Sequence, residues 1–245
     1  MRTSISPLLL YIANRVAQIP FMKSLLKPLY YPYKKKIWSN RNRLFQENAL
    51  KVLADFDYAM RTNNIPYSIF AGTLLGAVRE KGFIKHDLDV DTLMFYEDYS
   101  PHNRSILENA GFRLQRSFTI NEGQLGMEET YEKFGVTIDI YYIYHDDKYP
   151  TYQCDFHPEK GCSSCEESMR KYGYVKARRI EFPIEKSFID ILFEDKFVKA
   201  IINHNEWLEA RYGHDYMIPN PHFSDKGDNP NMFEWEEVKA IYHKY

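Results

Sequence analysis

Three aspartates that alternate with less polar residues constrain the fold of this chain more than any other feature. Asp87, Asp89 and Asp91 occupy every second position at the start of the segment 87–95. An alternation with a period of two predicts a β-strand, with the three carboxylates on one face and the residues between them on the other. Neighbouring side chains on such a face lie about 6.6 Å apart at the backbone. The sequence therefore predicts a sheet that carries a concentrated negative charge on one face.

A divalent cation would remove the repulsion between these carboxylates. Mg²⁺ prefers oxygen ligands, takes one or two carboxylates from the protein and completes its shell with water and substrate phosphates. Asp139 is a second anomaly, since it is the lone acid in the apolar, β-branched run 136–141 and a buried unpaired carboxylate is costly. If the two strands are neighbours, Asp89, Asp91 and Asp139 form one site for Mg²⁺ or Mn²⁺, with Asp87 beside it. The alternatives are a solvated acidic strand for Asp89 and Asp91 and, for Asp139, a helix N-cap or a buried hydrogen-bonded acid.

The turn before this strand is suited to binding a phosphate. The segment 67–70 predicts a short strand, Gly72 follows it, and Thr73 is a plausible cap for a helix over 74–80. A helix that begins directly after a strand offers free backbone N–H groups to an anion. We therefore expect Gly72 and Thr73 to bind a phosphate, with Arg79 as a further contact. A surface salt bridge is an equally good interpretation of Arg79.

Hydrophobic periodicity predicts a mixture of helices and strands in the rest of the chain. Helices are expected over 44–60, 103–110, most of 187–212 and about 235–242, and strands over 112–120 and 135–144. A chain of 245 residues with 44% hydrophobic side chains is long enough for one large core. The predicted fold class is α+β.

Two segments resemble the LicD family, which includes bacterial phosphocholine transferases and the eukaryotic fukutin and fukutin-related ribitol-phosphate transferases. The run Phe70–Asp91, FAGTLLGAVREKGFIKHDLDVD, resembles the family signature, and Trp207–Pro219, WLEARYGHDYMIP, is similar to its closing Tyr-Gly segment. The resemblance spans about residues 65–220. One departure is Leu88, because the family usually has consecutive aspartates before the metal-binding pair.

The resemblance implies a nucleotidyltransferase-like fold over residues 44–245, with a small mixed β-sheet flanked by helices. Asp89 and Asp91 correspond to the metal-binding pair, and Asp139 corresponds to the third acid, on a neighbouring strand. Gly72 and Thr73 correspond to the phosphate turn.

The implied reaction is the metal-dependent transfer of a phospho-alcohol, such as phosphocholine or ribitol phosphate, from a CDP-alcohol donor. The acceptor is a hydroxyl of a surface glycan, a lipid-linked saccharide or a lipopolysaccharide-type glycan, deprotonated with help from Asp139. Arg178 and Arg179 are candidates for phosphate contacts, or else belong to a solvated basic turn. Two alternatives are a nucleotidyltransferase that uses an NTP and releases pyrophosphate, and a non-catalytic zinc-dependent binding module.

The segment 145–172 has the residues of a zinc loop. The candidate ligands are Cys154, His157, Cys162 and Cys165, with His145 in reserve. Three thiolates and one imidazole can close a tetrahedron around Zn²⁺, and fukutin-related proteins resemble this chain in carrying a cysteine-rich zinc loop in the corresponding region. A metal-free reduced loop and a Cys162–Cys165 disulfide are the alternatives, and the odd number of thiols argues against the disulfide.

Residues 1–43 form a basic amphipathic segment. Nine basic residues and no acid precede Glu47, which leaves 23 basic and 34 acidic residues in the rest of the chain. Arg15 and Pro20 interrupt the apolar run, which argues against a transmembrane helix. The short apolar run 7–13 leads into Asn14 and Arg15 and not into a small-residue cleavage site, which argues against a signal peptide. The segment suits either an anionic membrane surface or packing against the domain. We expect a cytoplasmic protein, peripheral at the inner face of the membrane, with no nucleic-acid partner because the body is acidic.

Overall fold

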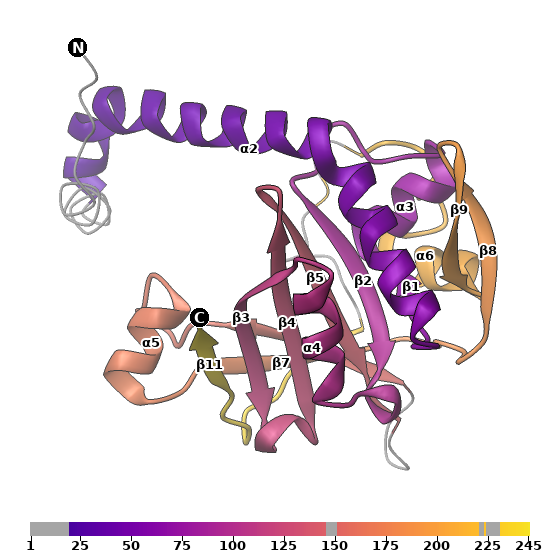
Figure 1. The fold of residues 1–245 in the computed structure, drawn as a ribbon. Helices are drawn as coiled ribbons and strands as arrows, with labels where there is room; N and C mark the ends of the chain where they lie inside the picture. Colours follow the sequence, from indigo (N-terminus) through magenta and orange to yellow (C-terminus); the bar gives the residue numbers. More distant parts are fainter. Residues whose placement is uncertain (1–19, 146–150, 221–222, 224–230) are drawn as a thin grey trace.

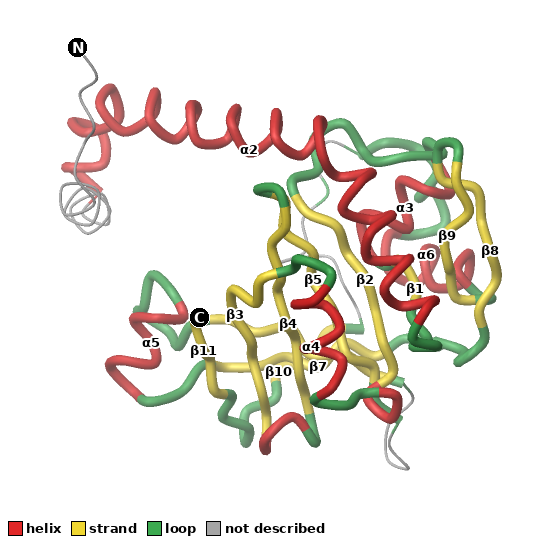
Figure 2. Tube along the Cα trace, viewed as in Figure 1, coloured by secondary structure: helices red, strands yellow, loops and turns green. Residues whose placement is uncertain are grey.

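The computed structural model describes residues 20–145, 151–220, 223 and 231–245. Its centre is a six-stranded sheet in the order β1-β2-β5-β4-β3-β11 (Figures 1 and 2). The strands are β1 (Ser68–Ile69), β2 (Asp89–Phe95), β3 (Arg113–Ile120), β4 (Gly126–Lys133), β5 (Val136–Ile143) and β11 (Ile241–Lys244). β2 and β5 run parallel, and the other neighbouring pairs of this sheet are antiparallel. This mixed sheet with its helices confirms the predicted α+β class.

Two helices, α2 (Pro20–Thr62) and α4 (His102–Asn109), cover one face of the sheet (Figure 1). The ring of Phe56, on the second half of α2, packs edge-on against Tyr67 and Phe112, with centroids 5.2 and 6.1 Å away. Burial of such aromatic side chains is a main source of core stability. The uncharged residues between the aspartates of β2 point toward these helices, so the aspartates point to the opposite face.

A second layer lies over part of that opposite face, where a three-stranded sheet with the order β10-β7-β6 crosses behind β3 and β4 (Figure 1). Its strands are β6 (Tyr152–His157), β7 (Lys176–Glu181) and β10 (Met232–Glu234). Phe118 of β3 stacks on Phe156 of β6 with centroids 4.8 Å apart and nearly parallel rings. This contact joins the two sheets.

The remaining elements surround the end of the sheet at which β2 begins. They are α3 (Ala71–Arg79), the hairpin of β8 (Phe188–Phe193) and β9 (Lys196–Ile201), and α6 (His204–Tyr212). Farther away lie α5 (Cys165–Tyr172) and two single turns of 3₁₀ helix, Tyr96–Asp98 and Asn121–Gly123.

The prediction that residues 187–212 are mostly helical is wrong. Residues 188–193 and 196–201 form the hairpin of β8 and β9, and the helix begins only at His204. β-Branched and aromatic residues in 188–193 favour a strand. Glu194 has φ 52° in the turn between the strands, a conformation that a continuous helix excludes.

The predicted closing helix near 235–242 is also wrong, because the chain ends in β11, which pairs with β3 at the edge of the main sheet. The segment 145–172 contains β6 and α5 within its described part. The sequence does not predict β4, because GMEETYEK is acidic and shows no apolar alternation. Most of this strand is nevertheless buried.

Helix α2 continues through the predicted boundary between residues 43 and 44, and its first half projects away from the rest of the chain (Figure 1). Residues 35–40 on this projection are exposed, including Ile37 and Trp38. Residues 1–19 of the predicted amphipathic segment lie outside the described residues. None of the helices described has the length and apolar character needed to cross a membrane.

We expect Gly76→Ala to destabilise the fold, although Ala is normally favoured over Gly in a helix. A Cβ at position 76 would collide with the carbonyl oxygen of Gly82 and lie 3.2 Å from the backbone nitrogen of Ile84. Backbone atoms cannot move aside as a flexible side chain can, so the free energy of unfolding should fall by about 1–3 kcal/mol. Urea denaturation measures the change, with Ser105→Ala on the exposed face of α4 as the control. Equal or greater stability of Gly76→Ala would contradict the close approach.

Candidate active site

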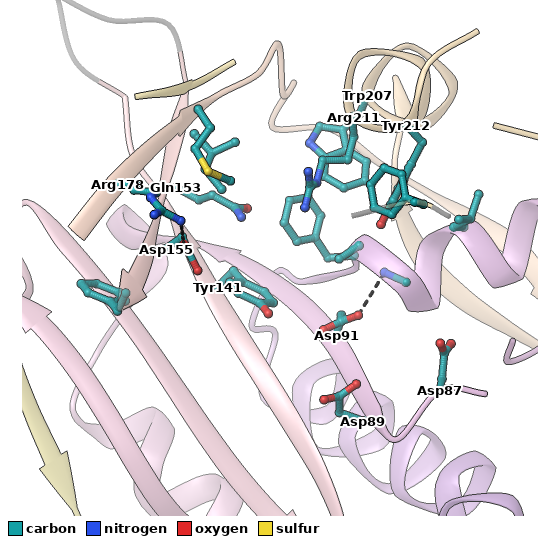
Figure 3. Close-up of a pocket in the computed structure, with 18 of the residues that line it drawn as sticks. Asp87, Asp89, Asp91, Tyr141, Gln153, Asp155, Arg178, Trp207, Arg211 and Tyr212 are labelled. Atoms are coloured by element: carbon teal, nitrogen blue, oxygen red, sulfur yellow. Dashed lines mark hydrogen bonds and ion pairs between the residues drawn. The ribbon is translucent and has the colours of Figure 1, made fainter. Parts of the chain in front are cut away.

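A cavity of about 670 Å³ opens between the two sheets, α3 and α6 (Figure 3). Its polar lining includes residues from four parts of the chain: Gly72 of α3; His86, Asp87, Asp89 and Asp91 in and before β2; Gln153, Asp155, His157 and Arg178 of the second sheet; and Trp207, Arg211 and Tyr212 of α6. Its volume is in the range typical of small-molecule sites. The cavity therefore brings together the two sequence segments that resemble the LicD signature.

The strand predicted over 87–95 begins only at Asp89, so Asp87 lies in the preceding loop, whereas Asp89 and Asp91 share the face of the sheet away from α2. Asp91 and Asp139 are direct partners in the parallel register of β2 and β5, and Asp89 precedes Asp91 by two residues on the same face. No hydrogen bond or ion pair among the described residues involves Asp89, and only the more distant positive charges of Arg41 and Arg116 oppose the rise in its pKa that burial causes. Burial raises the pKa of Asp91 well above its usual range, and the charges of Asp89 and Asp139 add to this effect. The folded protein therefore disfavours ionisation of these carboxyl groups, and a bound cation would remove this cost.

Asp139 lies behind the cavity wall rather than in the lining. Its Oδ1 accepts a hydrogen bond from the hydroxyl of Thr130 and lies 3.8 Å from a guanidinium nitrogen of Arg116. Arg116 also donates from Nε to the Thr130 hydroxyl over 2.9 Å. Burial raises the pKa of Asp139 to about 6, although the positive charge of Arg116 opposes this shift. Asp139 is therefore a buried, hydrogen-bonded acid beside Asp91, and its role as a metal ligand and base stays a prediction.

The backbone N–H of Gly72, predicted to bind a phosphate, binds a carboxylate in this structure. The backbone N–H of Gly72 donates to Asp91 Oδ2 over 3.0 Å, and a Cβ at position 72 would lie only 3.2 Å from that oxygen. Thr73 is fully buried, and its hydroxyl accepts a hydrogen bond from the Asp91 backbone N–H over 2.9 Å. Gly72 therefore lines the cavity, whereas Thr73 is buried outside the lining and positions β2 through its hydrogen bond.

The three predicted arginines lie in different places. Arg79 pairs with Glu80 over 2.8 Å and lines an adjoining cavity of about 730 Å³. Arg178 lines the main cavity, where its charge is shared with Glu234 and with Asp155 at 3.7 Å.

Arg179 points to the other side of β7, because successive side chains of a strand alternate. It pairs with Glu181 over 2.6 Å and stacks over Trp235, with its guanidinium carbon 5.2 Å from the ring centroid. Arg178 is therefore the member of the predicted pair that could contact a ligand in the cavity.

The zinc candidates do not form one cluster. Cys154 is buried between the sheets, with its sulfur 3.7 Å from the carbonyl oxygen of Leu125, whereas His157 Nε2 lies 3.3 Å from Glu234. Cys162 and Cys165 are partly exposed around the start of α5. Burial raises the pKa of the Cys165 thiol to about 11 and raises that of Cys154 further. A structural zinc at these residues, with His145 in reserve, stays a prediction.

Across the described part of the chain, no group of three or more His, Cys, Asp or Glu side chains stands in an arrangement that could hold a metal ion. This result does not exclude Mg²⁺ binding, because Mg²⁺ takes as few as one or two carboxylates from the protein and completes its shell with water and substrate phosphates. Asp89 and Asp91 are such a pair: both reach the cavity, and their oxygen donors are of the chemical type that Mg²⁺ prefers.

Sequence reasoning missed several residues that line the cavity. Arg211 adds a cation beside Trp207, and both belong to the segment that resembles the family's closing motif. That motif was the available signal for them. Gln153 gave no signal, because its role depends on how the second sheet folds over the first.

The sequence comparisons agree with this geometry. The family model described as LicD/FKTN/FKRP, nucleotidyltransferase domain, matches residues 64–189. The ribitol-5-phosphate transferase FKTN of Mus musculus is 26% identical over 208 residues, and that of Homo sapiens is 25% identical over 207. Each alignment covers 81% of this chain but 41% of the relative. An uncharacterised protein of Caenorhabditis elegans is 36% identical over 110 residues, or 41% of this chain and 27% of that protein.

The family match covers just over half of the chain, from the residues before β1 to the start of β8. It includes the carboxylate-bearing strands, the Gly72 position and the residues of β6 and β7 that line the cavity. The chain belongs to the LicD/FKTN/FKRP family of nucleotidyltransferase domains. It spans about two fifths of the length of the FKTN relatives.

We expect Asp87→Asn to stabilise the metal-free protein, and more strongly at neutral than at acidic pH. Burial raises the pKa of Asp87 to about 6, and its Oδ2 has no hydrogen-bond partner among the described residues. Between about pH 4 and 6 the unfolded chain releases this proton while the folded protein retains it, so the wild type loses stability as the pH rises.

Asn does not titrate. The stability difference in favour of the variant should therefore grow across this range to about 1–3 kcal/mol and then stay constant. Urea denaturation in EDTA at pH 4.5, 5.5 and 7 measures it, with the exposed Asp195→Asn as the control. A difference that is independent of pH would contradict the shifted pKa.

Proposed function

We propose that this chain is a metal-dependent transferase that moves a phospho-alcohol, such as ribitol phosphate or phosphocholine, from a CDP-alcohol to a glycan hydroxyl. Membership of the LicD/FKTN/FKRP family supports a phospho-alcohol transferase, and the FKTN relatives carry the name of ribitol-5-phosphate transferases. The observation that carries the proposal is the cavity in which the carboxylates of β2 face the aromatic and cationic residues of α6. A nucleotide fits this combination of an acidic end and an aromatic end.

In this proposal Asp89 and Asp91 hold Mg²⁺ or Mn²⁺, which neutralises the donor diphosphate when it is bound. The Gly72–Asp91 hydrogen bond keeps the second carboxylate in a fixed orientation. Arg211 and Arg178 contact phosphate oxygens, and for Arg178 this requires exchange from its carboxylate partners. An acceptor hydroxyl attacks the distal phosphorus, and CMP leaves. Most of the rate enhancement then comes from positioning and charge neutralisation.

The role of Asp139 follows from its place behind Asp91. Its hydrogen bonds to Thr130 and its contact with Arg116 fix the carboxylate beside the proposed metal pair. Direct deprotonation of the acceptor by Asp139, as the family resemblance implies, stays a prediction. A structural Zn²⁺ also stays a prediction, to be checked by the metal content of the purified protein.

We further propose that the projecting half of α2 lies on an anionic membrane surface, where a lipid-linked saccharide acceptor would be found. Lys35 and Lys36 are exposed next to Ile37 and Trp38, whose side chains are 43% and 50% exposed. Basic and amphipathic aromatic side chains together are typical of a surface that contacts lipid headgroups.

The transferase proposal predicts that Asp89→Asn abolishes Mg²⁺-dependent CMP release. The purified protein is incubated with CDP-ribitol, CDP-choline or CDP-glycerol and an acceptor glycan, and with the four NTPs in separate reactions. We expect CMP from one CDP-alcohol, lowered about a hundredfold or more in the variant because a charge-stabilising ligand is lost. Asp195→Asn, in the turn between β8 and β9, is the matched control. Pyrophosphate release from an NTP would instead support the nucleotidyltransferase alternative.

The membrane proposal predicts that the double variant Lys35→Glu/Lys36→Glu binds anionic vesicles at least about tenfold more weakly, because each basic residue near the lipid contributes roughly 1 kcal/mol. Co-sedimentation with phosphatidylserine-containing vesicles at 0.1 M salt measures this. Lys196→Glu on the exposed β8–β9 hairpin is the control. Wild-type binding that is absent, or that is indifferent to the double substitution, would refute the proposal.

A further inference from the structure

A second cavity, of about 730 Å³, adjoins the cavity of the candidate active site. The lining residues that the two share include Leu75 of α3, Ile84 and His86 in the loop before β2, and Tyr212 of α6. The carboxylates of β2 line the first cavity but not the second. Because His86 directly precedes Asp87, the shared wall lies beside the acidic end of the first cavity. A ligand in the second cavity would therefore lie next to this acidic end without occupying the place of the donor.

The other wall of the second cavity is the segment that follows α6. Gly213 comes directly after the helix and has φ 92°, a conformation that favours glycine. In the turns that follow, the N–H of Tyr216 donates to the Gly213 carbonyl over 3.1 Å, and the N–H of Ile218 donates to the Asp215 carbonyl over 2.7 Å. The Tyr216 hydroxyl also donates to Asn205 Oδ1 on α6 over 3.1 Å. Hydrogen bonds therefore fix this wall before a ligand binds, as in most small-molecule sites.

The lining of the second cavity combines apolar surface with a few polar groups. The ring of Tyr216 and the side chain of Ile218 supply apolar surface, and Ile218 is 69% exposed. Arg79 supplies guanidinium N–H donors, and Asp215 supplies carboxylate acceptors. A ligand that covers the apolar surface and hydrogen-bonds to both polar groups would be bound favourably, because water is removed from the apolar side chains.

The charges of this lining favour an uncharged ligand. Among the described lining residues, Arg79 is the one arginine or lysine, and Glu80 neutralises it over 2.8 Å. Asp215 adds a negative charge, so the cavity lacks the unpaired cations that a phosphate group needs. A saccharide fits this lining better. Its ring has a C–H face that packs on apolar side chains, and its hydroxyls both donate and accept hydrogen bonds.

We propose that the second cavity binds an uncharged saccharide, which is the acceptor of the proposed transferase. One sugar ring packs against Tyr216 and Ile218, and its hydroxyls hydrogen-bond to Arg79 and Asp215. The inference rests on the proposed function and adds the location of the acceptor and the class of sugar ring that it presents. A hydroxyl at the shared wall beside His86 then faces the donor in the first cavity.

Saturation-transfer difference NMR of the full chain tests the proposal in the presence of Mg²⁺ and CMP. The probes are the methyl glycosides of glucose, galactose, mannose, N-acetylglucosamine and N-acetylgalactosamine. We expect at least one glycoside to bind, and Tyr216→Ala to weaken its binding about tenfold because the aromatic packing surface is lost. Tyr216→Phe keeps the ring, so its affinity should stay within about twofold of the wild type. Tyr58→Ala, at a position on α2 that is 71% exposed, is the matched control.

A second variant, Asp215→Ala, removes an exposed carboxylate and should weaken glycoside binding about fivefold or more, because its hydrogen bonds to sugar hydroxyls are lost. Asp195→Ala, which is also exposed, is its control. The affinity for CMP, measured by isothermal titration calorimetry, should keep its wild-type value in Tyr216→Ala and Asp215→Ala, because neither residue lines the first cavity.

Wild-type protein that binds none of the glycosides would overturn the assignment. Glycoside binding that is unchanged in both Tyr216→Ala and Asp215→Ala would also overturn it, as would a loss of CMP affinity equal to the loss of glycoside affinity. The transferase proposal survives each of these results if CMP is released from a CDP-alcohol. Absence of that release would refute the transferase proposal, whereas glycoside binding that depends on Tyr216 and Asp215 would still support the saccharide site.

Discussion

Repulsion among carboxylates on one face of the sheet is the constraint on which the rest of this structure depends. The parallel pairing of β2 and β5 sets Asp91 beside Asp139, and the two-residue period of β2 adds Asp89. Neighbouring groups offset this repulsion between carboxylates only in part. The Gly72 N–H binds Asp91, while Arg116 and Thr130 hold Asp139. Asp89 has no hydrogen bond of this kind among the described residues, and only the more distant charges of Arg41 and Arg116 offset its burial, which leaves it available to a cation.

The cavity exists because distant parts of the chain fold over this acidic face. The stacked rings of Phe118 and Phe156 join the second sheet to the first, and Trp207 packs on Phe70 from α6. The resulting cavity has carboxylates at one end and aromatic rings at the other. Arg178 is partly neutralised by its acidic neighbours, so the unpaired negative charge of the aspartates dominates the acidic end. This polarity suits a ligand that has a metal-bound diphosphate and a flat ring.

Several residues that line the same cavity depart from the rule that buried polar groups are hydrogen-bonded. Asp87, Gln153 and Trp207 each bury a polar atom without a partner, and Asp87 has its pKa raised by burial. A protein selected for stability alone would satisfy or remove these groups. Their location around one cavity supports a binding role. Glu129, a buried acid of β4 outside the cavity, is in contrast well compensated, because it accepts hydrogen bonds from Tyr131 and Tyr142 and pairs with Arg104.

The sequence by itself determined the acidic strand from Asp89 and the α+β class, because both follow from local periodicity. It also predicted a helix next to Gly72, but this helix begins at Ala71 and is not capped by Thr73. It also indicated that Asp139 belongs with Asp91, since a lone acid in an apolar strand needs a partner. Only the tertiary structure decided that β4 is a buried strand despite its acidic sequence, and that 188–201 form a hairpin. It likewise separated Arg178 from Arg179 and brought Gln153 and Trp207 to the lining of one cavity, because which residues line a cavity depends on non-local packing that no local pattern encodes.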